Sequence, residues 1–180
     1  DRSVSRGLGD VYKRQGYDML IEACERLNSA DASLTAYKDA YELWIVGGGE
    51  LEKELEAQIG RLEVNNVKLL GRQENPYKFL KEADWFISSS RAEGYAIAPQ
   101  EAAILGVPVI ATDCSGVREL LGDSEYGIVI ESSTDAIADA MKNVLDNPEL
   151  RSGYEKAIKE RSKQIRLKIR MDKIERCLHG

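Results

Sequence analysis

Short apolar runs alternate with amphipathic helical patterns along most of this chain, and that alternation limits its fold more than any other feature. Five runs predict strands, at Glu42–Val46, Val67–Leu70, Trp85–Ser88, Val107–Ala111 and Gly127–Ile130. These runs are apolar on both faces, as parallel strands between two helical layers must be. The sequence therefore predicts an α/β fold, a Rossmann-like doubly wound parallel sheet with right-handed crossovers.

The expected helices lie before, between and after these strands. Met19, Leu20, Ala23 and Leu27 share one face of a first helix that begins at Gly16. Further helices are expected at Glu50–Arg61, Pro76–Ala83, Ala98–Leu105, Val117–Leu121, Thr134–Leu145, Glu149–Lys163 and Leu167–Leu178, and a polar loop at Asn28–Asp39. Ligands of doubly wound sheets bind beyond the carboxyl ends of the strands, so the loops after the strands are the candidates for a site.

The two ends of the chain differ from its centre. Residues 1 to 15 (DRSVSRGLGDVYKRQ) have neither helical nor strand periodicity, and we expect a disordered segment or an artefact of cloning, assembly or a gene boundary. Residues 16 to 180 suffice for one α/β domain with C-terminal helices. The last helix has an apolar face with basic residues around it. It is interpreted as a membrane-surface helix or, preferably, as a helix packed on its own or another domain.

The distribution of charge limits the kind of ligand. The formal net charge is −6, although residues 148–180 hold ten Lys and Arg against five Asp and Glu. An acidic chain is a poor candidate for nucleic-acid binding, which needs a basic surface. An anionic ligand would depend on backbone N–H groups, because the overall field repels it.

The sequence contains no evident targeting signal or metal motif. No apolar run approaches the ~20 residues of a membrane helix, and the first residues lack the apolar core of a signal peptide. Cys24, Cys114 and Cys177 are widely spaced, without the spacing of a metal site. Three thiols suit a reducing compartment. We expect a cytoplasmic protein, at most peripheral to the inner face of the cell membrane, with no metal.

A glycine run follows the first predicted strand. Gly47 and Gly48 would let backbone approach a phosphate or a sugar at a helix N-terminus, or they simply form a tight turn. The dinucleotide motif G-x-G-x-x-G fails, because Glu52 stands at its third glycine position. A nicotinamide oxidoreductase is therefore the least favoured function.

A stronger signal follows the third predicted strand. Glu93 and Glu101 lie eight residues apart, and Pro99 stands in the first turn of a helix. Backbone N–H groups at this helix N-terminus would bind an anion, while two carboxylates would accept hydrogen bonds from hydroxyl groups. The alternatives are a solvated charge at Glu93 and a helix-dipole partner at Glu101.

These residues resemble a known family. Glu93 to Glu101 is similar to the E-x7-E signature of retaining GT-B glycosyltransferases of group 1, also called family 4. Residues 88–95 (SSSRAEGY), 101–112 (EAAILGVPVIAT) and 115–119 (SGVRE) resemble its central motifs. Residues 16–23 (GYDMLIEA) and 46–49 (VGGG) fall in the same order, so the resemblance covers residues 16 to 150. It implies the C-terminal, donor-binding half of a GT-B fold, such as enzymes of polysaccharide biosynthesis contain.

The resemblance also implies roles for single residues. Glu101, Arg72 and Gln73 would bind the nucleoside, with Glu101 on the ribose hydroxyls. The donor sugar would lie on Glu93, Gly94, Tyr95 and Ala96, and the diphosphate on backbone N–H groups of Ile97 and Ala98. The implied substrate is a nucleotide diphosphate sugar, from which a hexosyl group moves with retained configuration to a glycan or lipid-linked acceptor. No metal or other cofactor is required for that chemistry.

Departures from the family pattern bear on activity. Gln15 stands where the family places a diphosphate-binding Lys, and Ala96 stands where Gly is common. The family's N-terminal acceptor domain and its catalytic His loop have no counterpart here, and His179 is interpreted as a tail residue. We therefore assign no catalytic residue and expect this chain to be inactive alone. The alternatives are a stand-alone nucleotide-sugar subunit that docks a separate acceptor-binding chain, and a GT-B-type nucleotide-sugar epimerase.

Overall fold

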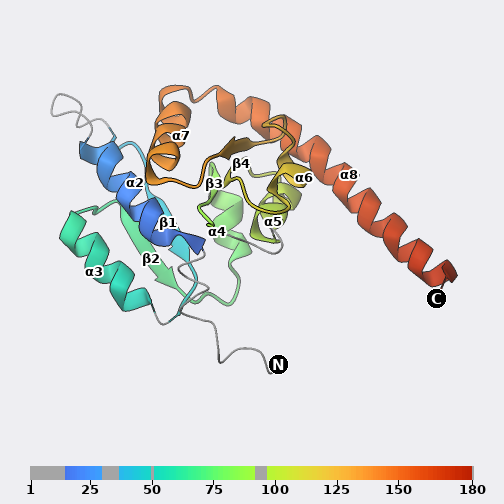
Figure 1. The fold of residues 1–180 in the computed structure, drawn as a ribbon, viewed down its shortest axis with the longest axis horizontal. Helices are drawn as coiled ribbons and strands as arrows, with labels where there is room; N and C mark the ends of the chain where they lie inside the picture. The colour runs from blue at the N-terminus through green and yellow to red at the C-terminus, as the bar shows by residue number, and fades with distance from the viewer. Residues whose placement is uncertain (1–14, 30–36, 50, 92–96, 180) are drawn as a thin grey trace.

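The computed structural model describes residues 15–29, 37–49, 51–91 and 97–179, with side chains up to residue 165 (Figure 1). Residues 1–14, 30–36, 50, 92–96 and 180 lie outside this description. Glu93, Gly94, Tyr95 and Ala96 fall in that set, as does most of the predicted N-terminal segment.

The described residues contain five strands, and all pair in parallel. They are β1 (Leu43–Val46), β2 (Val67–Gly71), β3 (Phe86–Ser88), β4 (Val109–Thr112) and β5 (Ile128–Ile130). β1 pairs with β2, and β3, β4 and β5 form a three-stranded sheet in that order. Each predicted strand is confirmed within two residues of its expected ends. β4 is buried over its whole length, since it lies between β3 and β5 and packs against α5.

The strand order is that of a doubly wound sheet. In the order 3-2-1-4-5-6, the second and third strands lie on one side of the first, and the fourth to sixth lie on the other. β1 and β2 match the second and third positions, and β3 to β5 match the fourth to sixth. The described residues include no strand at the first position, which precedes α2 in the chain.

Helices pack on the sheets to form two cores. The helices are α2 (Tyr17–Ser29), α3 (Glu52–Leu62), α4 (Tyr77–Glu82), α5 (Ile97–Leu105), α6 (Val117–Leu121), α7 (Thr134–Asp146) and α8 (Leu150–His179). One core joins α2, α3 and α7 to β1 and β2, with Ile21 fully buried in it. The other joins α5, α6 and α8 to β4, with Ile158 fully buried. The predicted α/β fold is confirmed, with helix ends within two residues of expectation up to α7.

The C-terminal region differs from the prediction. Two helices were expected, at Glu149–Lys163 and Leu167–Leu178, but α8 runs unbroken from Leu150 to His179 (Figure 1). The reason is local, since residues 164–166 (QIR) contain neither Pro nor Gly and all three tolerate a helix. Among the described residues, no helix is long and apolar enough to cross a membrane.

Candidate functional site

The turn before α2 contacts the loop after β3. Gly16 has a φ of 67°, and a β-carbon added there would lie 2.0 Å from the carbonyl oxygen of Ser89. The hydroxyl of Ser89 donates to the carbonyl of Gln15 at 2.8 Å. Only glycine allows this approach, because it combines a left-handed backbone with no side chain. Two loops distant in sequence are thereby held together at the carboxyl edge of the sheet.

An ion pair adds to this contact. The guanidinium of Arg91 donates to both carboxylate oxygens of Asp18, each at 2.7 Å. Partial burial acts to raise the pKa of Asp18, but the hydrogen bond and charge of Arg91 outweigh it, so the pKa lies below its usual value. The pair fixes the start of the segment that leads to α5, relative to the first turn of α2.

The loops after β3 and β4 are also joined. The carbonyl of Ser90 accepts hydrogen bonds from the hydroxyl of Thr112 at 2.5 Å and from the thiol of Cys114 at 2.9 Å. Thr112 and Ser90 are buried, so these bonds satisfy polar groups that would otherwise cost free energy. The loop after β3 is thus held from two sides before α5 begins.

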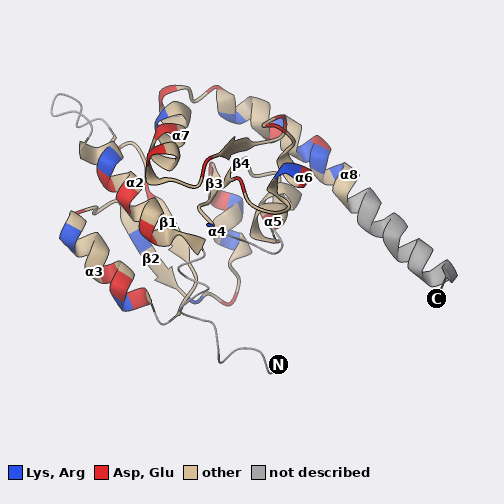
Figure 2. Ribbon diagram, in the orientation of Figure 1, with Lys and Arg blue, Asp and Glu red and all other residues tan. Residues whose placement is uncertain are grey.

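The N-terminus of α5 lies at the same edge. Ile97 and Ala98 are exposed at its start, whereas Pro99 is buried. The first N–H groups of a helix have no intrahelical partner, and with the helix dipole they favour an anion. The ribbons of α2, α3 and α7 carry several positions coloured as Asp or Glu (Figure 2). In so acidic a domain, such backbone N–H groups are a suitable place for a phosphate.

Glu101 and Tyr77 form a polar pair beside this helix end. Glu101 is partly exposed in the first turns of α5, and Tyr77 is the first residue of α4. The hydroxyl of Tyr77 donates to Oε1 of Glu101 at 2.9 Å. This hydrogen bond, with the negative charge of Glu101, raises the pKa of Tyr77. Glu101 therefore presents a carboxylate at the edge where the family resemblance implies a ribose.

The loop after β2 contributes Arg72 and Gln73. Arg72 is exposed, and a β-carbon added to Gly48 would lie 3.3 Å from both the Cβ and the backbone nitrogen of Arg72. Gly47 donates its N–H to the carbonyl of Gly71 at 2.9 Å. The glycine run after β1 and the loop after β2 are therefore neighbours. The side chain of Gln73 donates to the carbonyl of Leu70 at 2.6 Å, which shapes its own loop.

Comparison with known proteins shows the family. The family model of the glycosyl transferases group 1 matches residues 7–161. The chain belongs to this family. The residues matched by the family model extend at both ends beyond residues 16–150, the range over which the motifs resemble the family. The resemblance to the C-terminal half of a group 1 enzyme with a GT-B fold is confirmed.

One relative agrees with this membership, and one solved structure agrees with the fold. A Campylobacter jejuni enzyme, N-acetylgalactosamine-N,N'-diacetylbacillosaminyl-diphospho-undecaprenol 4-alpha-N-acetylgalactosaminyltransferase, is 32% identical over 175 residues, which are 95% of this chain and 45% of the relative. The solved C-terminal domain of LpcC, a glycosyl transferase group 1 family protein from Francisella tularensis, has a TM-score of 0.72 at 21% identity. That match covers 84% of this chain and 80% of the LpcC domain.

A third comparison includes a bound nucleotide. A mutant of S. aureus TarM, solved in complex with UDP among other ligands, has a TM-score of 0.71 and is 25% identical. The match covers 82% of this chain and 29% of that one. This group 1 domain therefore spans less than half the length of the C. jejuni enzyme and of TarM.

The sequence did not single out Tyr77, although the structure pairs it with the candidate residue Glu101. Of the expected ligand-binding residues, the structure places Gly47, Gly48, Arg72, Gln73, Ile97, Ala98 and Glu101 in loops or at a helix start on one edge. Tyr77 could have been noticed as an aromatic residue directly after Pro76, at a helix start that follows the same loop as Arg72. Its pairing with Glu101 joins two elements 24 residues apart, which periodicity does not reveal.

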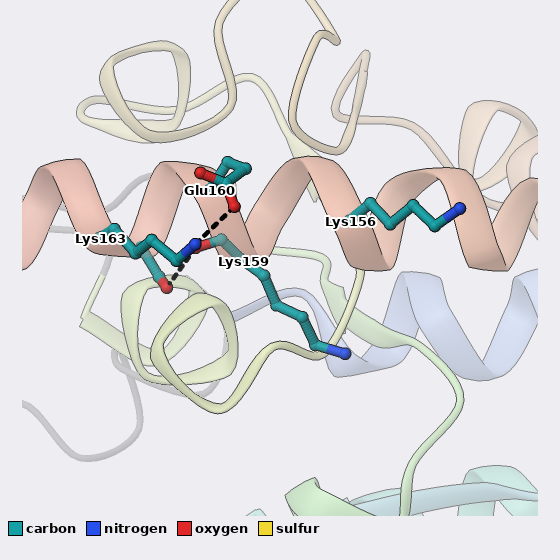
Figure 3. A pocket seen from close by; sticks show the side chains of 5 residues that line it. Lys156, Lys159, Glu160 and Lys163 are labelled. Atoms are coloured by element: carbon teal, nitrogen blue, oxygen red, sulfur yellow. Dashed lines mark hydrogen bonds and ion pairs between the residues drawn. The ribbon is translucent and has the colours of Figure 1, made fainter.

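A separate hollow lies on α8 (Figure 3). It has a volume of 590 Å³ and is lined by Lys156, Lys159, Glu160, Ser162 and Lys163. Lys159 lies over Gly106, at the end of α5 opposite to Glu101. The hollow is therefore away from the strand carboxyl ends. Within the described residues, no group of three or more His, Cys, Asp or Glu could hold a metal ion.

Proposed function

We propose that this domain binds a nucleoside diphosphate sugar at the carboxyl edge of its sheet, as the donor half of a retaining glycosyltransferase. One observation carries the proposal: the Glu101 carboxylate and the N-terminus of α5 lie on a single helix, at the edge where doubly wound sheets bind ligands. Family membership and the UDP bound by a similar solved structure support it.

In this proposal, each part of the ligand binds to a different set of residues. Glu101 accepts hydrogen bonds from the ribose hydroxyls, because an ionised carboxylate only accepts. The N–H groups of Ile97 and Ala98 bind the diphosphate at the positive end of the helix dipole. Arg72 and Gln73 lie along the base. Gly48 lies beside Arg72, and Gly47 donates its N–H to the carbonyl of Gly71. Both glycines are proposed to approach the sugar or phosphate.

The reaction breaks the bond between C1 of the donor sugar and the leaving diphosphate oxygen. Charge develops on that oxygen as the bond breaks, and preoriented N–H groups at α5 stabilise it without reorganisation. Glu93, and the neighbouring Gly94, Tyr95 and Ala96, are proposed to hold the sugar hydroxyls. No metal takes part in this proposal, since the helix N-terminus supplies the stabilisation.

The acceptor is proposed to bind outside these residues. The C. jejuni relative is named for a diphospho-undecaprenol acceptor and is about twice as long as the matched region. We propose a glycan or lipid-linked acceptor, held by a second domain that faces the donor site. Without it, positioning worth roughly 7–11 kcal/mol is missing, so these 180 residues alone are proposed to be inactive.

Isothermal titration with uridine, guanosine and adenosine diphosphates tests the binding site. One base is expected to bind best, and Glu101→Ala should weaken its binding by about 1–3 kcal/mol, roughly 5- to 150-fold, by removing a charged acceptor. Glu56→Ala on the exposed face of α3 is the matched control and should bind as wild type does. Equal affinity of the Glu101 variant and wild type would reject the ribose assignment.

A further inference from the structure

Tyr77 has a position that its packing does not explain. It is 46% exposed, although a tyrosine ring is large enough to add considerable burial to a core. α4 contains no buried residue, and the helix is held instead by Phe79, edge-on to Trp44, and by Leu80 against the second core. Within the part of the chain that the structure describes, the hydroxyl of Tyr77 donates a hydrogen bond to Glu101. An exposed tyrosine that donates to a carboxylate is suited to orient that carboxylate, here the side chain of Glu101.

The hydrogen bond from Tyr77 restricts the conformations of the Glu101 side chain before a ligand binds. A free glutamate samples several rotamers, and fixing one of them costs conformational entropy. A phenol that already donates to Oε1 restricts those rotamers before any ligand arrives, while Oε2 and the remaining lone pairs still accept hydrogen bonds. A site fixed in this way has less conformational freedom to lose on binding.

We propose that Tyr77 is a positioning residue of the nucleoside site, which orients the carboxylate of Glu101 to accept from the 2′- and 3′-hydroxyls of a ribose. This inference rests on the proposed function, because it needs a ribonucleotide at Glu101. It specifies which part of the ligand depends on Tyr77: the ribose diol, and neither the base nor the diphosphate.

The specificity of that dependence gives the experiment. The wild-type chain, Tyr77→Phe, Glu101→Ala and the double variant are titrated with uridine, guanosine or adenosine diphosphate, whichever binds tightest, and with its 2′,3′-dideoxy analogue. Tyr77→Phe keeps the ring and removes one hydroxyl, so it should weaken ribonucleotide binding by about two- to twelvefold, the usual effect of one hydrogen bond. Binding of the dideoxy analogue should not change.

Two comparisons separate positioning from a structural role. In the double variant, the loss should be no larger than in Glu101→Ala alone, because Tyr77 acts through Glu101. Tyr154→Phe is the matched control, since Tyr154 lies on α8 against Trp85 and its variant should bind as wild type does. Melting temperatures of Tyr77→Phe and wild type should agree within a few degrees, because the side chain is half exposed.

The outcomes distinguish the two proposals. If wild type and Tyr77→Phe bind the ribonucleotide with equal affinity, the role of Tyr77 is rejected and the proposed function is unaffected. Equal weakening for the ribonucleotide and the dideoxy analogue also rejects it, since the effect would then not pass through the diol. If wild type binds none of the three diphosphates, the proposed function fails, and the inference about Tyr77 fails with it.

Discussion

Among the glycines for which the structure gives the surroundings of an added β-carbon, Gly16 has the closest contact. A β-carbon there would lie 2.0 Å from the carbonyl oxygen of Ser89 and 2.8 Å from Cε of Met19, at a φ of +67°. Left-handed backbone costs a non-glycine residue about 1–2 kcal/mol, and overpacking costs about 1–3 kcal/mol more. Gly16→Ala should therefore lower the free energy of unfolding by about 2–5 kcal/mol, a large part of the stability of one domain.

Urea unfolding, followed by the fluorescence of Trp44 and Trp85, measures this change. Gly60→Ala in α3 is the matched control, because its added β-carbon meets nothing within 4 Å and its backbone is not left-handed. That control should raise stability by about 0.5–1 kcal/mol, through the better helix propensity of alanine. Equal shifts for the two variants, or a Gly16→Ala protein as stable as wild type, would refute the close approach of the two loops.

Three further predictions concern charge, boundary and activity. Asp18 has a lowered pKa in the fold, so its ion pair contributes stability above an unfolded pKa near 3.8 and loses it as pH falls through the folded pKa. Arg91→Ala should cost at most about 1 kcal/mol at neutral pH, because the pair is partly exposed, and this difference from wild type should shrink in urea titrations below pH 4. Deleting residues 1 to 14 should shift the melting temperature by no more than a few degrees, and a larger loss would place the domain boundary earlier. The chain alone should transfer no sugar from a panel of nucleotide sugars. Fusion to a native N-terminal half should restore transfer with retained configuration, and Glu93→Ala should then lower turnover more than diphosphate binding. Transfer by the isolated chain would contradict the half-enzyme proposal.

The strands and most helices could be predicted because their causes are local. A strand covered on both faces must be apolar throughout, and Val109–Thr112 carries that pattern in its own residues. The single helix α8 was missed because basic residues interrupt its apolar spacing near Arg166, while nothing there breaks a helix. Amphipathic spacing reports which face packs, whereas continuity depends on the absence of Pro and Gly.

The contacts within the site could not be predicted from local patterns. Gly16 and Ser89 meet because the turn before α2 lies against the loop after β3, and Arg91 reaches Asp18 across 73 residues of sequence. The partnership of Tyr77 with Glu101 depends on how α4 packs beside α5. A motif indicates which residues serve the chemistry, but the packing of helices decides which side chains support them.

Amide NMR spectra recorded during titration with a nucleoside diphosphate test the central proposal most directly. The account predicts that chemical-shift changes gather at Arg72, Gln73, Ile97, Ala98 and Glu101, because the ligand lies on the N-terminus of α5 and the loop after β2. The lysine-lined hollow on α8 is the competing anion site, and its residues should not respond. Changes confined to residues 156–163 of α8, with the start of α5 unaffected, would contradict the proposed site.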